Sequence, residues 1–101
     1  MKYVLIGSES AVLGFSMVGV DCRKADSESA ARQALEDAFS QEDVGIIIIT
    51  ESVADMIRDE VNRSMFTRSF PLIVEIPDEH TISRSRTSMR DLAHQAIGIS
   101  L

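Results

Sequence analysis

Four short runs of apolar residues alternate along the chain with longer segments in which apolar and polar residues recur at helical spacing. Continuous apolar runs are typical of strands that are covered on both faces. Spacings of three and four residues are typical of helices that bury one face. The pattern predicts strands at 3–6, 18–22, 44–49 and 70–77, the second being the weakest of the four.

The clearest strand is 44–49, because its four consecutive isoleucines resist helix formation and suit a pleated interior. A central place in the sheet is the economical interpretation. After it, Ser52 and Asp55 stand in a capping-box-like spacing that predicts the start of one helix. The apolar stripe of that helix is Val53, Met56, Ile57, Val61 and Met65.

Strand and helix alternate four times, and each parallel pair of strands needs a crossover connection. The sequence therefore predicts an α/β fold: a small doubly wound domain with a four-strand parallel sheet and helices on both faces, plus a C-terminal helix. We expect residues 1–77 to form the α/β domain and 78–101 to form a polar hinge and the C-terminal helix, as a single domain overall. Glu75 lies on the last strand, which predicts a solvated or salt-bridged carboxylate at a sheet edge.

Composition narrows the possible functions. A chain of 101 residues has room for one core, and its net charge of −6 argues against general nucleic-acid binding. Cys22 is the one cysteine, so no intramolecular disulfide forms and a reducing cytosol is expected. We see no apolar run long enough to span a membrane and expect no direct membrane insertion.

The ends of the predicted strands show no catalytic motif. A dinucleotide site needs G-x-G-x-x-G after the first strand, but here Gly7 is followed by no glycine until Gly14, and no phosphate-loop motif is present. A phospho-receiver needs an acidic cluster after its first strand and an aspartate at the end of its third, whereas Glu9 is a lone carboxylate and the third strand ends in Thr50. Neither His80 nor His94 shares a motif with Cys22, which is more typical of a small buried thiol. We therefore predict no catalytic, cofactor-binding or metal-binding residues and no cofactor.

Charge is uneven along the chain and marks two candidate partner surfaces. Residues 1–57 hold ten acids and four bases, whereas 58–101 hold six of each. One candidate surface is the start and apolar face of the last helix, and the other follows the second strand. The candidate interface residues are Cys22, Arg23, Lys24, Arg84, Arg86, Met89, Arg90, Leu92 and Ile97.

Four segments together resemble those of the F subunits of V-type and archaeal A-type rotary ATPases. The segment 6–15 followed by 18–20 resembles the opening of that family, in which a glycine after the first strand precedes a short acidic helix that ends in Gly-Phe. The likeness continues through 44–51, 71–77 and 96–99 in the same order and spacing. It covers nearly the whole chain.

The resemblance implies a noncatalytic subunit of the central rotor stalk with a Rossmann-like or receiver-like sheet. It implies binding to the coiled coil of the D subunit, in a complex with the catalytic A and B subunits and the membrane-rotor adaptor subunit. Such a subunit is cytoplasmic and peripheral to the membrane and helps couple ATP hydrolysis or synthesis to proton or sodium ion transport. Its C-terminal helix can change position, and the resemblance implies a regulatory role through that helix. The alternative is a receiver-like or nucleotide-binding regulatory domain.

Overall fold

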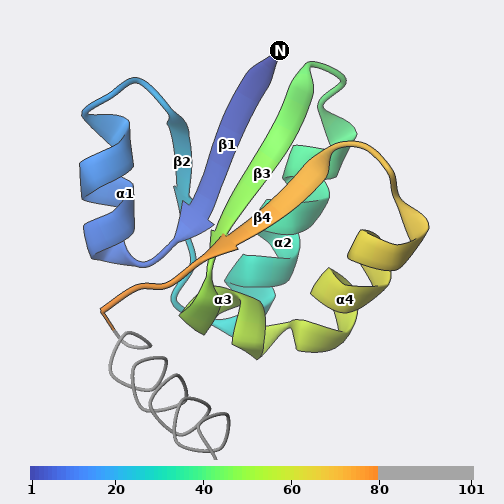
Figure 1. Ribbon diagram of the computed structural model, residues 1–101. Coiled ribbons are helices and arrows are strands. Elements are labelled where there is room, and N and C mark those ends of the chain that lie inside the picture. The colour runs from blue at the N-terminus through green and yellow to red at the C-terminus, as the bar shows by residue number, and fades with distance from the viewer. Residues whose placement is uncertain (80–101) are drawn as a thin grey trace, which may run out of the picture.

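The computed structural model of the chain describes residues 1–79 (Figure 1). Its four strands form one parallel sheet in the order β2-β1-β3-β4. The strands are β1 (Lys2–Gly7), β2 (Asp21–Lys24), β3 (Val44–Thr50) and β4 (Leu72–Ile76). The predicted α/β class and the central place of the isoleucine strand are confirmed.

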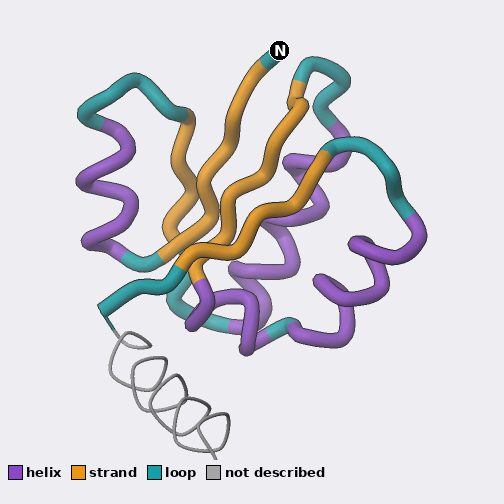
Figure 2. Tube along the Cα trace, viewed as in Figure 1, coloured by secondary structure: helices purple, strands orange, loops and turns teal. Residues whose placement is uncertain are grey.

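The helices lie on both faces of this sheet (Figure 2). On one face α2 (Glu28–Ser40), α3 (Glu51–Met56) and α4 (Arg58–Thr67) pack on the sheet, while α1 (Glu9–Ser16) lies against β1 and β2 on the other. The predicted C-terminal helix, and nearly all of the predicted hinge at 78–85, lie outside the described residues.

One core joins the sheet to α2, α3 and α4. Alternation along β3 sends Ile47 and Ile49 into it, and both are 0% exposed. On α2 the inward side is mostly alanine, which lets the helix approach the sheet closely, and Ser27 caps this helix by accepting a hydrogen bond from the Ala30 backbone N–H. The remaining buried core members come mainly from β1, β3, α3 and α4, and Ile73 of β4 packs against them while partly buried.

The second strand lies further along the chain than the apolar pattern predicts. Residues 17–19 form a turn in which Gly19 has a φ of 86°, and β2 begins only at Asp21. Because β2 is an edge strand, its side chains are held by ion pairs such as Lys2–Asp21, at 3.0 Å, rather than by burial. The prediction of a strand at 18–22 was therefore wrong in its bounds, since the strand begins three residues later and ends at Lys24.

The single helix predicted after β3 is two helices. The helix is interrupted at Ile57, whose φ of −130° and ψ of 41° are not helical and whose side chain is 1% exposed. The break rotates the second half, so Ser64 is buried and Met65 is 42% exposed. The predicted capping box is also absent, since Ser52 donates its hydroxyl hydrogen bond to Asp78 instead.

The exit from β4 is fixed by polar contacts with distant elements. Glu75 accepts a hydrogen bond of 2.6 Å from Arg58, as expected for a carboxylate on an edge strand. Beyond the strand, Asp78 is 5% exposed and accepts a hydrogen bond from the Ser52 hydroxyl. Glu79 accepts a 2.6 Å hydrogen bond from Ser10. The chain therefore leaves the described body from a defined place beside α1 and α3.

Candidate functional site

The carboxyl edge of the sheet carries a hollow of about 390 Å³ where β1, β2 and β3 end. Ligands of doubly wound sheets usually bind at this edge. Here, however, two carboxylates accompany one ammonium group, and Lys24 lies 4.0 Å from Glu9. The balance of charge disfavours a phosphate. The lining residues are Ser8, Glu9, Lys24, Ala25, Asp26, Ser52, Val53 and Met56.

The end of β3 is closed by close packing. Thr50 is 0% exposed, and its methyl group would lie 2.7 Å from a Cβ added at Gly7. Within residues 1–79, its hydroxyl makes no hydrogen bond. A threonine thus occupies the position at which a phospho-receiver carries its phosphorylated aspartate. Over the same residues, no group of three or more His, Cys, Asp or Glu side chains is placed to hold a metal ion.

The structure brings Cys22, Arg23 and Lys24 together on β2, as part of the strand rather than after it. Arg23 donates a 2.6 Å hydrogen bond to Asp37 and holds the pKa of that carboxyl below its ordinary value. Both cations of this predicted surface therefore have acidic neighbours within the chain.

The Cys22 thiol is half-buried and donates a hydrogen bond of 3.2 Å to the Val20 carbonyl. Burial, and then the charge of Asp21, raise the pKa of this thiol above its ordinary value. A thiol that stays protonated is a poor nucleophile.

We predict that Cys22 reacts slowly with iodoacetamide at pH 7 and that its alkylation rate rises at a higher pH than that of free cysteine. The rise should occur above about pH 8.5, the ordinary cysteine value. The measurement is the alkylation rate of the folded chain by mass spectrometry between pH 6 and 10. A midpoint below that of free cysteine would contradict the raised pKa.

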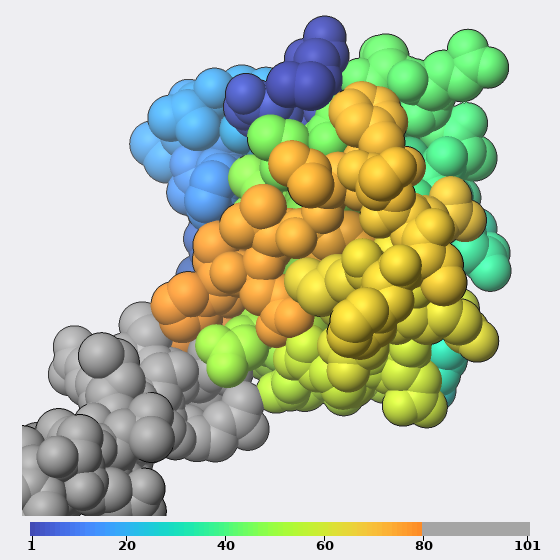
Figure 3. All heavy atoms as spheres, turned by 45° about the vertical axis from the view of Figure 1, so that its right-hand side comes forward, coloured from blue at the N-terminus to red at the C-terminus, as the bar shows by residue number. Residues whose placement is uncertain are grey.

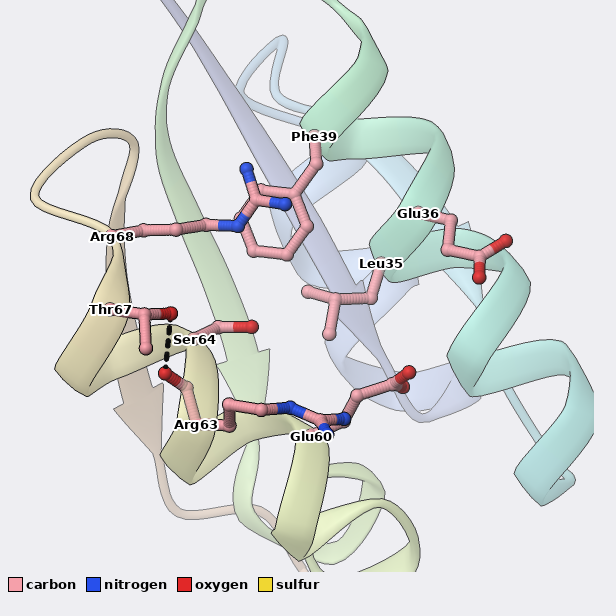
Figure 4. A pocket seen from close by; sticks show the side chains of 8 residues that line it. All are labelled: Leu35, Glu36, Phe39, Glu60, Arg63, Ser64, Thr67 and Arg68. Atoms are coloured by element: carbon pink, nitrogen blue, oxygen red, sulfur yellow. Dashed lines mark hydrogen bonds between the residues drawn. The ribbon is translucent and has the colours of Figure 1, made fainter.

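A second surface, which the sequence did not predict, is a groove of about 330 Å³ between α2 and α4 (Figure 4). The Arg68 guanidinium lies 4.0 Å from the centre of the Phe39 ring, a cation–π contact between the two helices. Figure 4 also shows the Glu36 carboxylate turned to the outer side of α2. The full lining is Leu35, Glu36, Phe39, Glu60, Arg63, Ser64, Thr67 and Arg68, and we call it the α2–α4 groove.

Exposed apolar side chains gather at two places on the described body. One group, at the end of α1, comprises Leu13, Met17 and Val18; the other follows α4 and β4 and comprises Met65, Phe66, Phe70, Leu72 and Val74. Figure 3 shows α4 and β4 side by side on one face of the molecule. Large exposed apolar groups of this kind mark interaction surfaces. The other predicted interface residues, Arg84, Arg86, Met89, Arg90, Leu92 and Ile97, lie outside the described residues.

The fold and these surfaces define a parallel α/β domain with two exposed groups of apolar side chains. Among its described residues, no helix is long and apolar enough to cross a membrane. The family model of the ATP synthase (F/14-kDa) subunit matches residues 4–93. The chain therefore belongs to the F subunits of the A-type and V-type ATP synthases, as its sequence resemblance indicated.

Relatives and a solved structure agree with this assignment. The A-type ATP synthase F subunit of Pyrococcus furiosus is 34% identical over an alignment of 106 positions that covers 100% of this chain and 98% of the relative. That of Methanocaldococcus jannaschii is 29% identical and covers 100% of this chain and 99% of the relative. The crystal structure of the V-type ATP synthase F subunit of Archaeoglobus fulgidus has the same fold, with a TM-score of 0.65 and 21% identity over 74% of this chain and 95% of that one.

Proposed function

We propose that this chain is a noncatalytic subunit of the central rotor stalk of an A-type or V-type ATP synthase. In this role it binds the D subunit and helps couple ATP hydrolysis or synthesis in the A and B subunits to proton or sodium ion transport. It works in the cytoplasm, peripheral to the membrane, next to the membrane-rotor adaptor subunit. The observation that carries this proposal is the family match over residues 4–93.

The described body suits a part that transmits torque. A stalk subunit must pass on force without deforming, and closely packed interiors have low compressibility. Here β1 and β3 lie at the centre of the sheet with Leu5, Ile6, Ile47 and Ile49 all 0% exposed. The closed end of β3 and the acidic hollow beside it favour a structural role over the receiver-like or nucleotide-binding alternative.

Co-expression with the D subunit of the same source tests the proposal. We expect a stable one-to-one complex by size exclusion with light scattering, because a stalk subunit is held permanently. The matched control is the same chain titrated with acetyl phosphate or ATP in the presence of Mg²⁺, for which we expect no binding. Binding of those compounds without a complex with D would support the receiver-like alternative instead.

The segment 80–101 supplies a second candidate contact. We propose that Arg84, Arg86 and Arg90, with Met89, Leu92 and Ile97 on an apolar face, either dock on the α/β domain or reach along the D coiled coil, and that this choice regulates the complex. A chain that ends after Glu79 keeps the Asp78 and Glu79 contacts. If that chain binds D with unchanged affinity and supports unchanged ATPase coupling, the segment 80–101 has no role in D binding or coupling.

The cations of β2 are the remaining candidate contact from the sequence. Cys22, Arg23 and Lys24 lie on an edge strand, so a partner can reach them. Two variants distinguish the contribution of β2 to D binding from that of the segment 80–101. One replaces three cations of the segment (Arg84→Gln, Arg86→Gln, Arg90→Gln), and the other replaces the two cations of β2 (Arg23→Gln, Lys24→Gln). The D affinity of each variant ranks the two surfaces.

A further inference from the structure

The α2–α4 groove holds the two cations of the described body that have no acidic partner there. Residues 1–79 contain seven Lys and Arg side chains. Five of them form ion pairs with carboxylates: Lys2, Arg23, Lys24, Arg32 and Arg58. Arg63 and Arg68 form none within residues 1–79, although fifteen Asp and Glu side chains are present in the same stretch. Both line the same groove.

The groove presents these guanidiniums in a form suited to carboxylates. Stacking on Phe39 holds the Arg68 plane in place while leaving its N–H edges free for a planar anion. The two acids of the lining do not compete for it, because Glu60 lies 3.4 Å from Arg32 and the Glu36 carboxylate turns outward (Figure 4). The lining therefore offers two guanidiniums that form no ion pair within residues 1–79, beside one carboxylate that is paired with Arg32 and one that is turned away.

An apolar anchor lies on the same helix. Phe66 is 90% exposed and stands in the sequence between Arg63 of α4 and Arg68, the residue that caps this helix, and Met65 beside it is 42% exposed. Aromatic and arginine side chains at one place are typical of the residues that dominate binding energy at protein interfaces. A lone exposed phenylalanine needs no explanation, but one that stands near two arginines with no ion pair within residues 1–79 favours a partner surface.

We propose that the α2–α4 groove, together with Phe66, is a docking surface for a protein segment that carries carboxylates beside an apolar side chain. In the assembly this segment belongs to the D subunit, so the inference rests on the proposed function and names the surface through which that function acts. Charge complementarity selects this occupant. The rest of the chain, 80–101, has three arginines and one aspartate, and so matches the groove in sign rather than opposing it.

The surface lies on α4, away from β2 and outside the segment 80–101. The inference therefore differs from both contacts that the sequence suggested. The groove is lined by residues of α2 and α4, which both pack on the core. A partner bound there therefore contacts packed helices rather than a loop.

Titration of the full chain into the purified D subunit tests the docking surface. We expect a Phe66→Ser variant and an Arg63→Gln, Arg68→Gln double variant each to bind D at least about tenfold more weakly than the unchanged chain. The weakening in the double variant should shrink as salt is raised from about 0.05 to 0.5 M, because screening acts on charge pairs. Circular dichroism and urea midpoints near those of the unchanged chain show that the variants are folded.

Two matched variants separate this surface from general effects. Tyr3→Ser removes an apolar side chain that is 46% exposed on β1 and belongs to neither exposed apolar group, and Ser29→Glu lowers the net charge by one at the exposed start of α2. We expect both to bind D as the unchanged chain does. If the unchanged chain binds D and the groove variants bind equally well, the docking surface is wrong while the proposed function stands.

Two further outcomes are also decisive. If the unchanged chain fails to bind D at all, the proposed function fails, and the assignment of the groove to D fails with it. If light scattering shows that the chain pairs with itself and that Phe66→Ser abolishes the pairing, the occupant is a second copy of this chain, and the proposal is overturned.

Discussion

Replacing Ile47 by alanine is expected to lower the free energy of unfolding by about 2–5 kcal/mol, whereas the same change at Ile48 should cost less than half as much. The two residues are neighbours on β3 with the same side chain. Ile47 is 0% exposed and belongs to the core shared with α2, α3 and α4, while Ile48 is half-buried on the opposite face. A domain of this size has about 5–15 kcal/mol of stability, so the Ile47 variant should be close to unfolding.

The measurement is urea unfolding of both variants, followed by circular dichroism at 222 nm. Since the substitutions are identical in chemistry, the difference between them reports which face of β3 is packed. Equal losses would mean that both faces are covered to the same depth, which would contradict the one-sided core. A larger loss at Ile48 would mean that the packed core lies on the opposite face of β3, which would contradict the structure.

Replacing Gly7 by alanine should destabilise the protein by about 1–3 kcal/mol, the usual cost of overpacking a filled interior. The added Cβ would lie 2.7 Å from Thr50 Cγ2 and 3.3 Å from Thr50 Oγ1. These atoms cannot retreat, since Thr50 is 0% exposed and sits in the last position of β3. The carboxyl ends of β1 and β3 meet at this point.

A second substitution identifies the cause. Thr50→Ser removes the methyl group that a Cβ at Gly7 would meet, so the Gly7→Ala, Thr50→Ser double variant should recover much of the loss in thermal or urea unfolding. Gly45→Ala is the control, because the atoms nearest to its added Cβ belong to the flexible side chain of Met1, which is 80% exposed and can move away. Equal losses at Gly7 and Gly45 would show that backbone freedom, rather than contact with Thr50, requires the glycines.

The sequence was most informative where burial is continuous. The isoleucines of β3 and the alanine face of α2 follow periodicities that only a covered strand and a packed helix produce. Edge strand β2 escaped this reasoning, because Asp21, Arg23 and Lys24 are held by ion pairs to β1, α2 and α1 rather than by burial. The sequence 18–20 therefore predicted a strand that begins three residues before β2 does.

The break between α3 and α4 and the α2–α4 groove were missed for a related reason. Ile57 fits a continuous helical stripe in the sequence, and its change of backbone direction follows from packing against the whole core. Arg63 and Arg68 form no ion pair within residues 1–79, and this cannot be recognised from spacing either. They stand out only once the other described cations, such as Arg32 and Arg58, are seen to be paired with carboxylates.

Rotation of the chain itself is the most direct test of its proposed place in the rotor. A Glu42→Cys, Cys22→Ser variant carries a single exposed thiol in the turn before β3, to which a bead or gold particle can be attached. The labelled chain would be assembled with D and with a surface-fixed ring of A and B subunits, and observed during ATP hydrolysis. We expect the particle to rotate in one direction and to stop when ATP is removed. A particle that remains stationary while the same complexes hydrolyse ATP and D rotates would contradict a place for this chain in the rotor stalk.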